Sequence, residues 1–271
     1  MKKIVIDMYP VSTPFVGLGE FCRHLGDRIS NRADELYRDH NIEIYFLLPP
    51  AYKGCFGNHV KYICVPPSLR WTLPLYPIKA DLLHIPYQCS KVKNIILAKN
   101  RLVTIHDINF VYEKKNKNLR RAERKFRNKI RRADYVNYIS NFACEDAERH
   151  FKMPQSKKII YNGVSDLTSL PYLNSLPEGL PDKFMFHISS LQPKKNVHLL
   201  VDMMKYIPDR NLVIAGDWEN DYSRGIKKSI IGNNLHNIFI LPNISEVEKA
   251  ALYDKCTAFL FPSMCEGFGL P

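Results

Sequence analysis

The chain has 271 residues, 45% of them hydrophobic, which is enough for two domains of ordinary size with separate cores. No apolar run approaches the roughly 18 residues that span a bilayer, and the start of the chain predicts a first strand rather than a signal peptide. Seven cysteines without a C-x-x-C pair favour reduced, mostly buried thiols in a cytoplasmic protein, and indicate neither a zinc site nor a disulfide framework.

Strands and helices are predicted to alternate along the first part of the chain. A long helix is expected from residue 20 to about 37, and another from 143 to 151. The strands are short apolar runs at 4–8, 42–48, 60–65, 81–85, 102–105, 135–139 and 158–161. This alternation is typical of parallel sheets built from βαβ units.

Residues 166–183 interrupt the pattern with three prolines and no periodicity, as expected of a linker. We therefore expect an N-terminal domain over 1–165 and a second domain over 184–271. The second domain has strands at 184–188, 212–215, 238–241 and 257–261, with helices at 197–206, 222–231 and 246–254. The predicted class is α/β, with two doubly wound, Rossmann-like domains facing a cleft in which ligands bind.

The net charge of +12 is concentrated in one segment. Residues 113–132 carry eleven Lys or Arg and two Glu, a local net charge of +9. Apolar residues at three- and four-residue spacing predict an amphipathic helix with a narrow apolar stripe. Three interpretations of this helix are open: a face that is only solvated, a face that contacts an anionic membrane, or one that binds nucleic acid. The absence of interleaved aromatic residues ranks nucleic acid below the membrane.

The loop after the first strand holds Gly17-Leu18-Gly19 ahead of the first helix. It lacks the third glycine of the dinucleotide fingerprint, and no acidic residue ends the following strand, which disfavours a nicotinamide dehydrogenase. A loop that cradles a phosphate or the acceptor, and a purely structural turn, both remain open. Further along, His106 and Asp107 end the strand 102–105, where polar residues favour a catalytic function.

Two loops of the second domain carry phosphate-binding chemistry. Ser189 and Ser190 end its first strand, and Lys194 and Lys195 come just before the next helix, where they are placed to pair with a diphosphate. The alternative is a pair of surface lysines before a helix that Asn196 caps. The last strand leads into Glu266-Gly267-Phe268-Gly269-Leu270, in which the glycines permit close approach of the backbone to a ligand.

Six motifs in order resemble one family. They are Gly17-Leu18-Gly19, Ile105-His106-Asp107, Ile139-Ser140-Asn141-Phe142, Tyr161-Asn162-Gly163-Val164, Pro193-Lys194-Lys195-Asn196 and Glu266-Gly267-Phe268-Gly269-Leu270-Pro271. Together they look like the retaining, nucleotide-sugar-dependent glycosyltransferases of family four, which have the GT-B fold. Each motif alone is weak, whereas the ordered set covers nearly the whole chain.

The resemblance implies an acceptor site in the first domain and a nucleotide-diphosphate sugar in the second. It implies donor-binding positions at Ser189, Ser190, Lys194 and Lys195 and along Gly267, Phe268, Gly269 and Leu270. Glu266 would contact the transferred sugar, and His106, beside Asp107, would lie next to that sugar in the cleft. Catalysis would need neither a metal nor another cofactor.

The implied reaction transfers a hexose, with mannose as the candidate sugar, to a glycan or lipid-linked saccharide in polysaccharide biosynthesis. The enzyme would be cytoplasmic, with its 114–132 basic helix against the inner face of the membrane. The family pairs Glu266 with a second glutamate that would fall beyond Pro271, so the second domain is expected to be truncated. The competing hypotheses are a catalytically defective remnant that acts only as a binding module and a basic nucleic-acid-binding protein.

Overall fold

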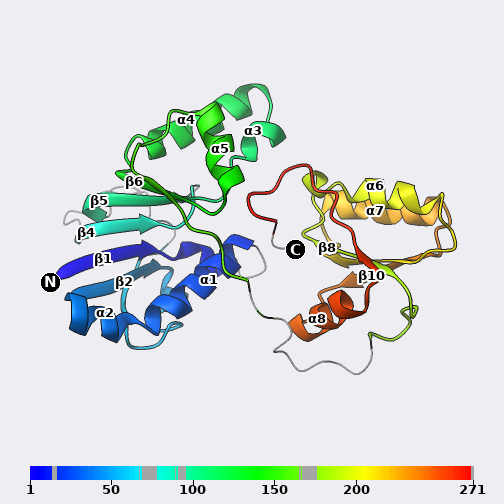
Figure 1. The fold of residues 1–271 in the computed structure, drawn as a ribbon, viewed down its shortest axis with the longest axis horizontal. Helices are drawn as coiled ribbons and strands as arrows, with labels where there is room; N and C mark the ends of the chain where they lie inside the picture. Colours follow the sequence, from blue (N-terminus) through cyan, green and yellow to red (C-terminus); the bar gives the residue numbers. More distant parts are fainter. Residues whose placement is uncertain are drawn as a thin grey trace. The chain divides into compact units, whose positions relative to one another are not determined.

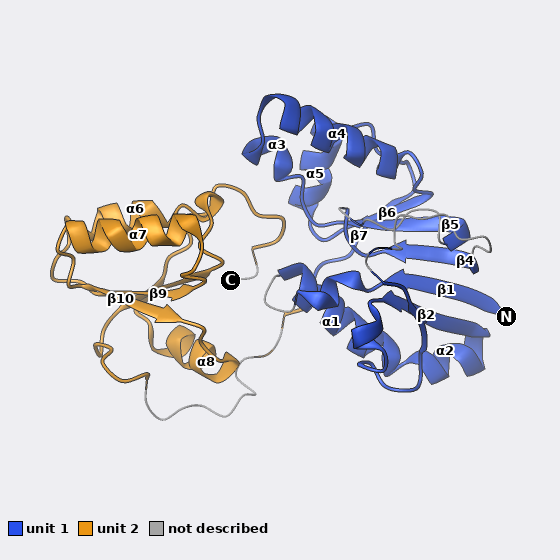
Figure 2. Ribbon diagram, turned by 180° about the vertical axis from the view of Figure 1, so that it is seen from behind, with its two compact units in different colours: residues 1–162 blue, residues 163–271 orange. Residues whose placement is uncertain are grey.

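The computed structural model describes residues 1–13, 17–66, 68, 78–88, 90, 96–164, 166 and 176–269. The chain divides into two compact units, residues 1–162 and 163–271 (Figure 2). Residues 167–175 of the predicted linker, and Leu270 of the predicted donor loop, lie outside the described residues.

Unit 1 is built on a sheet of seven parallel strands in the order β3-β2-β1-β4-β5-β6-β7. Each apolar run found in the sequence supplies one strand, and β4 and β5 extend further toward their amino ends than predicted. The strands are β1 Lys2–Asp7, β2 Ile42–Leu48, β3 Lys61–Cys64, β4 Ile78–Ile85, β5 Ile96–Ile105, β6 Tyr135–Tyr138 and β7 Lys157–Ile159. The order reverses between β1 and β4, which creates a topological switch point at the carboxyl edge.

Two groups of helices cover the unit 1 sheet on opposite sides (Figure 1). Helices α1 (Gly17–Ser30) and α2 (Ala33–His40) pack on one face, where Ile6 and Phe46 belong to a buried apolar cluster. Helices α3 (Phe110–Glu113), α4 (Asn116–Ile130) and α5 (Asn141–His150) lie on the other side. Short 3-10 turns η1 (Tyr9–Ser12) and η2 (Pro50–Tyr52) follow β1 and β2.

The prediction of one long helix over 20–37 is wrong, because the chain breaks between α1 and α2. The side chain of Ser30 donates a hydrogen bond to the carbonyl of Phe56 instead of facing solvent. Ser30 and Asn31 also have weak helix propensity, so a tertiary hydrogen bond at this point readily ends the helix.

Unit 2 has a four-stranded parallel sheet in the order β10-β9-β8-β11. Its strands are β8 Met185–Ser189, β9 Leu212–Gly216, β10 Ile238–Pro242 and β11 Ala258–Phe259. Helices α6 (Val197–Met204) and α7 (Asp221–Gly232) cover one face, on which Trp218 and Ile214 are buried. Helix α8 (Glu246–Lys255) covers the other face through Leu252, against Phe186 and Val213 (Figure 1).

The cysteines differ from the expectation of mostly buried thiols. All six described cysteines are free, but only Cys22 and Cys144 are buried, whereas Cys55 is exposed. Cys55 lies in the turn after η2, and the sequence around it contains no apolar run that would indicate burial. Among the described helices, none has the length and apolar character needed to cross a membrane.

Candidate functional site

The carboxyl ends of β8 and β11 form the topological switch point of unit 2. From β8 the chain winds outward to β9 and β10, and α8 then returns it to the opposite side of β8. Loops that leave neighbouring strands in opposite directions separate at such a point and leave room for a ligand. The loop after β8 carries Lys194 and Lys195, and the loop after β11 carries Glu266, so the two predicted donor segments meet there.

Lys195 and Glu266 form an ion pair in this region, with 2.5 Å between Nζ and Oε1. Their side chains are 12% and 25% exposed, so both charges are largely shielded from water. The Lys195 ammonium also lies 5.4 Å from the ring centroid of Phe261. One backbone hydrogen bond joins the same loops, from Met264 N–H to the Lys194 carbonyl at 2.9 Å.

A 3-10 turn aims Lys195 into the switch point. Pro193–Lys195 forms this turn, η5, because Pro193 fixes its own φ angle at the first position of the turn. Asn196 follows with φ 60°, in the left-handed region that asparagine tolerates. Asn196 occupies the N-cap position of α6, as the alternative expects, but its side chain makes no capping hydrogen bond to the helix.

Ser189 and Ser190 contribute to the loop through contacts within the protein. The hydroxyl of Ser189 accepts a hydrogen bond from Leu191 N–H at 3.2 Å. The carbonyl of Ser190 accepts one from the side chain of Asn220 at 3.4 Å. At the end of β9, a Cβ on Gly216 would lie 2.1 Å from the Ser189 carbonyl oxygen, so only glycine permits this close approach.

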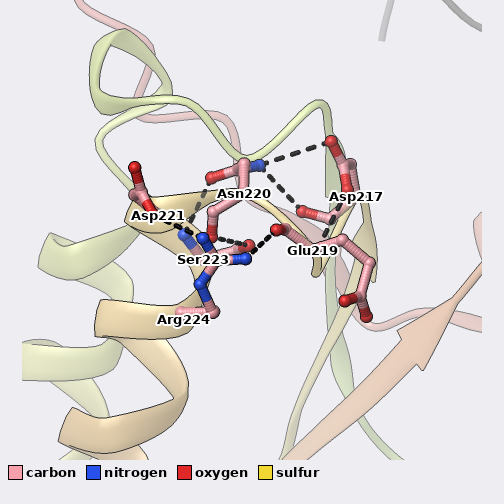
Figure 3. A network of polar contacts seen from close by, with 6 residues as sticks. All are labelled: Asp217, Glu219, Asn220, Asp221, Ser223 and Arg224. Atoms are coloured by element: carbon pink, nitrogen blue, oxygen red, sulfur yellow. Dashed lines mark hydrogen bonds and ion pairs between the residues drawn. The ribbon is translucent and has the colours of Figure 1, made fainter.

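Asn220 organises the neighbouring β9–α7 loop (Figure 3). Its side-chain oxygen accepts from Ser223 N–H at 2.9 Å and caps α7, while its amide nitrogen donates to the Asp217 carbonyl at 3.0 Å. Arg224 reaches back from α7 to the carboxylate of Asp221 and the carbonyl of Glu219 (Figure 3). This network fixes the loop beside Ser190, and nothing in the sequence motifs had singled it out.

In unit 1, His106 and Asp107 lie at the carboxyl end of β5. His106 is buried, and its Nε2 donates to the Pro86 carbonyl at 2.9 Å. Phe21 of α1 meets the imidazole edge-on, with 4.6 Å between ring centroids. Burial lowers the pKa of His106 to about 4, so its imidazole is neutral at neutral pH.

Gln88, in the loop after β4, holds this strand exit in place. Its side-chain oxygen accepts from His106 N–H at 3.2 Å, and its amide donates to the Asp107 carbonyl at 2.8 Å. The carboxylate of Asp107 accepts from Asn109 N–H at 3.1 Å. Sequence reasoning missed Gln88, because only the pairing of β4 with β5 brings it beside His106.

A buried carboxylate connects the two strand ends at the switch point of unit 1. Asp7, at the end of β1, has no exposed surface, and its Oδ2 accepts from the Ser90 hydroxyl at 2.5 Å. Lys129 of α4 donates in turn to the Ser90 carbonyl. One lysine of the basic helix is thereby tied to the sheet edge that holds His106, a connection that the sequence did not indicate.

The glycine pair at the start of α1 divides into two different positions. A Cβ on Gly19 would lie 1.9 Å from the Thr13 carbonyl oxygen, whereas nothing lies within 4 Å of a Cβ on Gly17. Gly19 is therefore required by the close packing of α1 on the preceding turn. Gly17 is free of that constraint.

The chain resembles known glycosyltransferases in sequence. Residues 172–271 match the family described as "Glycosyl transferases group 1". The O-antigen chain mannosyltransferase RfbU of Salmonella typhimurium is 23% identical over 68% of this chain and 51% of its own length. The uncharacterized glycosyltransferase MJ1178 of Methanocaldococcus jannaschii is 27% identical over 70% and 51%. The chain thus spans about half the length of these two relatives.

Longer similarities extend over almost the whole chain. O-antigen chain mannosyltransferase B of Escherichia coli is 21% identical over 99% of this chain and 78% of its own length. Sucrose-phosphate synthase from Thermosynechococcus elongatus superimposes with a TM-score of 0.73 over 100% of this chain and 77% of that one, at 17% identity. The galactosyltransferase WaaB gives 0.58 over 99% and 76%, at 18% identity. The fold is the α/β fold of GT-B glycosyltransferases.

The two glycines of α1 supply a matched test of this site. Gly19→Ala should lower the free energy of unfolding of unit 1 by about 1–3 kcal/mol, because the clash is with a backbone carbonyl that no rotamer change relieves. Gly17→Ala should be neutral or stabilising by up to about 1 kcal/mol. Urea unfolding of both variants provides the measurement, and equal effects would contradict the packing described for Gly19.

Proposed function

We propose that the chain carries out hexosyl transfer from a nucleotide-diphosphate sugar to a glycan or lipid-linked saccharide, with mannose as the favoured sugar. The observation that carries the proposal is the Lys195–Glu266 pair at the switch point of unit 2. Both residues fall within the segment that matches the glycosyltransferase family. Three relatives named as mannosyltransferases of O-antigen or serotype-specific type support the choice of sugar and of polysaccharide biosynthesis.

Lys195 and Lys194 would serve the leaving group. When the bond between the anomeric carbon and the diphosphate breaks, the electron pair stays with the phosphate oxygen, and a nearby ammonium lowers the energy of that charge. An acceptor hydroxyl forms the new bond to the anomeric carbon from the same face that the diphosphate leaves, and its proton passes to the departing phosphate. The configuration at the anomeric carbon is therefore retained. The proposed mechanism needs no metal, because the lysines supply the positive charge.

Glu266 would bind hydroxyl groups of the transferred sugar, and the backbone of Gly267, Phe268 and Gly269 would lie along the donor. Gly269 has φ 80°, a conformation that leaves its backbone open to close approach. In unit 1, we propose an acceptor-binding role for the edge formed by His106, Asp107, Gly17 and Gly19. Because Nε2 of the neutral His106 donates to Pro86, its Nδ1 would accept a hydrogen bond from an acceptor hydroxyl there.

The donor site predicts a specific response to loss of Lys195. Lys195→Ala should weaken binding of GDP or UDP, whichever the protein prefers, by roughly 1.5–3 kcal/mol, which is about 10- to 150-fold. Isothermal titration calorimetry measures the change. Lys205, at the other end of α6 and paired with Asp202 at 2.7 Å, is the matched control, and Lys205→Ala should leave affinity unchanged.

A second variant, Glu266→Gln, tests the contribution of Glu266 apart from that of Lys195. A nucleoside diphosphate has no transferred sugar, so Glu266→Gln should bind it at least as tightly as the natural chain, because Lys195 is no longer neutralised. Unchanged affinity of Lys195→Ala, with the fold intact, would remove Lys195 from the donor site. Turnover of GDP-mannose by the natural chain distinguishes an enzyme from a module that only binds.

We also propose that α4 contacts an anionic membrane surface from the cytoplasmic side. Ten of the eleven basic residues between 113 and 132 are exposed, whereas Phe126 and Ile130 face the core. The exposed residues are Lys114, Lys115, Lys117, Arg120, Arg121, Arg124, Lys125, Arg127, Arg131 and Arg132. A dense cationic face on a firmly anchored helix suits lipid headgroups.

Vesicle co-sedimentation tests the role of α4. Changing Arg120, Arg124 and Lys125 to Gln should weaken binding to phosphatidylglycerol vesicles, with about 1 kcal/mol lost per residue at most. A charge-matched control changes three exposed lysines elsewhere in unit 1, Lys53, Lys152 and Lys158, to Gln and should have a smaller effect. Equal effects of the two variants, or equal binding to phosphatidylcholine vesicles, would show that α4 is only a solvated helix face.

A further inference from the structure

His187 lies in the middle of β8 and belongs to none of the motifs in the sequence. Its side chain has no exposed surface. β8 is flanked by β9 on one side and by β11 on the other, so His187 lies beneath both loops that carry the proposed donor-binding residues. A fully buried imidazole must satisfy its two nitrogen atoms within the protein.

The hydrogen bonds of His187 determine which nitrogen carries the proton. Nδ1 lies 2.8 Å from the carbonyl oxygen of Leu260, which can only accept, so Nδ1 is the protonated nitrogen. Nε2 is then an acceptor, and the Ser189 hydroxyl donates to it at 2.9 Å. The Ser189 oxygen in turn accepts from Leu191 N–H. One imidazole thus connects the start of the 260–269 loop with the start of the 190–196 loop.

Leu191 shows why this connection is needed. Its φ angle is 44°, in the left-handed region that branched side chains rarely occupy. Such a conformation costs free energy and persists only where surrounding contacts hold it. The hydrogen bond from Leu191 N–H to Ser189 and the complete burial of the leucine side chain supply those contacts.

The imidazole of His187 is also connected to the ion pair, through the ring of Phe261. Phe261 stacks on His187 with 6.3 Å between ring centroids and 27° between planes. The Lys195 ammonium lies over the same Phe261 ring. A displacement of His187 would therefore move both the backbone before Lys195 and the aromatic ring against which Lys195 rests.

We propose that His187 is a positioning residue for the donor site, which holds the two loops so that Lys195 and Glu266 meet. This inference rests on the proposed function. Burial lowers the pKa of His187, and the Lys195 charge adds to this effect against the opposing hydrogen bond to Leu260. The imidazole consequently stays neutral and keeps Nε2 available to Ser189.

Three substitutions separate the two hydrogen bonds of His187. His187→Phe keeps an aromatic ring but loses both bonds. His187→Gln places an amide near the position of Nε2 and keeps a partner for Ser189, whereas His187→Asn places one near Nδ1 and keeps a partner for Leu260. His198, an exposed histidine of the same unit that bonds to Tyr222 at 2.9 Å, is the control and is changed to Phe.

Hydrogen exchange and nucleotide titration of the full chain provide the test. His187→Phe should speed exchange at the Leu191 amide and across 261–269 at least about tenfold and weaken GDP or UDP binding about tenfold, the loss expected for one to two hydrogen bonds. His187→Gln should recover part of the affinity, and His198→Phe should match the natural chain. Nitrogen chemical shifts should show the proton of His187 on Nδ1.

Two results would overturn the inference: unchanged exchange at these amides in His187→Phe, or a proton on Nε2 in the natural chain. If the natural chain binds neither GDP nor UDP, the proposed function fails. The exchange and the chemical shifts would still decide whether His187 holds the loops.

Discussion

The ion pair between Lys195 and Glu266 is the contact on which the proposed donor site depends. It joins two residues 71 positions apart and lies where the strand order of the sheet reverses. Burial of two charges is costly, and their mutual attraction offsets that cost only in good geometry. Removing one partner would leave the other charged and partly shielded from water. In the proposed function, an anionic ligand takes the place of one partner when the pair separates.

Such a pair also suits a donor site. A diphosphate can take the place of the Glu266 carboxylate at Lys195, while Glu266 turns to sugar hydroxyl groups. In the proposed site, a ligand that carries both a diphosphate and a sugar would contact both residues after they separate, which favours the complete donor over its fragments. Several contacts hold the loops around the pair, namely those of His187, the Phe261 ring and the Asn220 network at the next strand end.

The sequence predicted the elements well, because apolar runs and helical periodicity are local signals. Most strands and helices begin within a few residues of their predicted positions. The helix break at Ser30 could not be predicted, since it depends on a hydrogen bond to Phe56, 26 residues away. The exposure of Cys55 likewise depends on how its turn lies on the folded unit.

Candidate site residues could be named from the sequence where they belong to loops with recognisable motifs, as Lys195, Glu266 and His106 do. The structure pairs Lys195 with Glu266 and buries His106 against Phe21, neither of which spacing along the chain reveals. Asp7, Gln88 and His187 gave no signal, because a single polar residue in or beside a buried strand has no pattern. Their partners come from neighbouring strands, so only the sheet topology identifies them.

The most direct test of this account is a crystal structure of the chain with the nucleoside diphosphate that it binds. We expect a phosphate oxygen within hydrogen-bond distance of Lys195 Nζ, with the Glu266 carboxylate moved away from that ammonium. The loops after β8 and β11 should otherwise keep their backbone course. A nucleotide bound elsewhere, with the Lys195–Glu266 pair intact, would contradict the account.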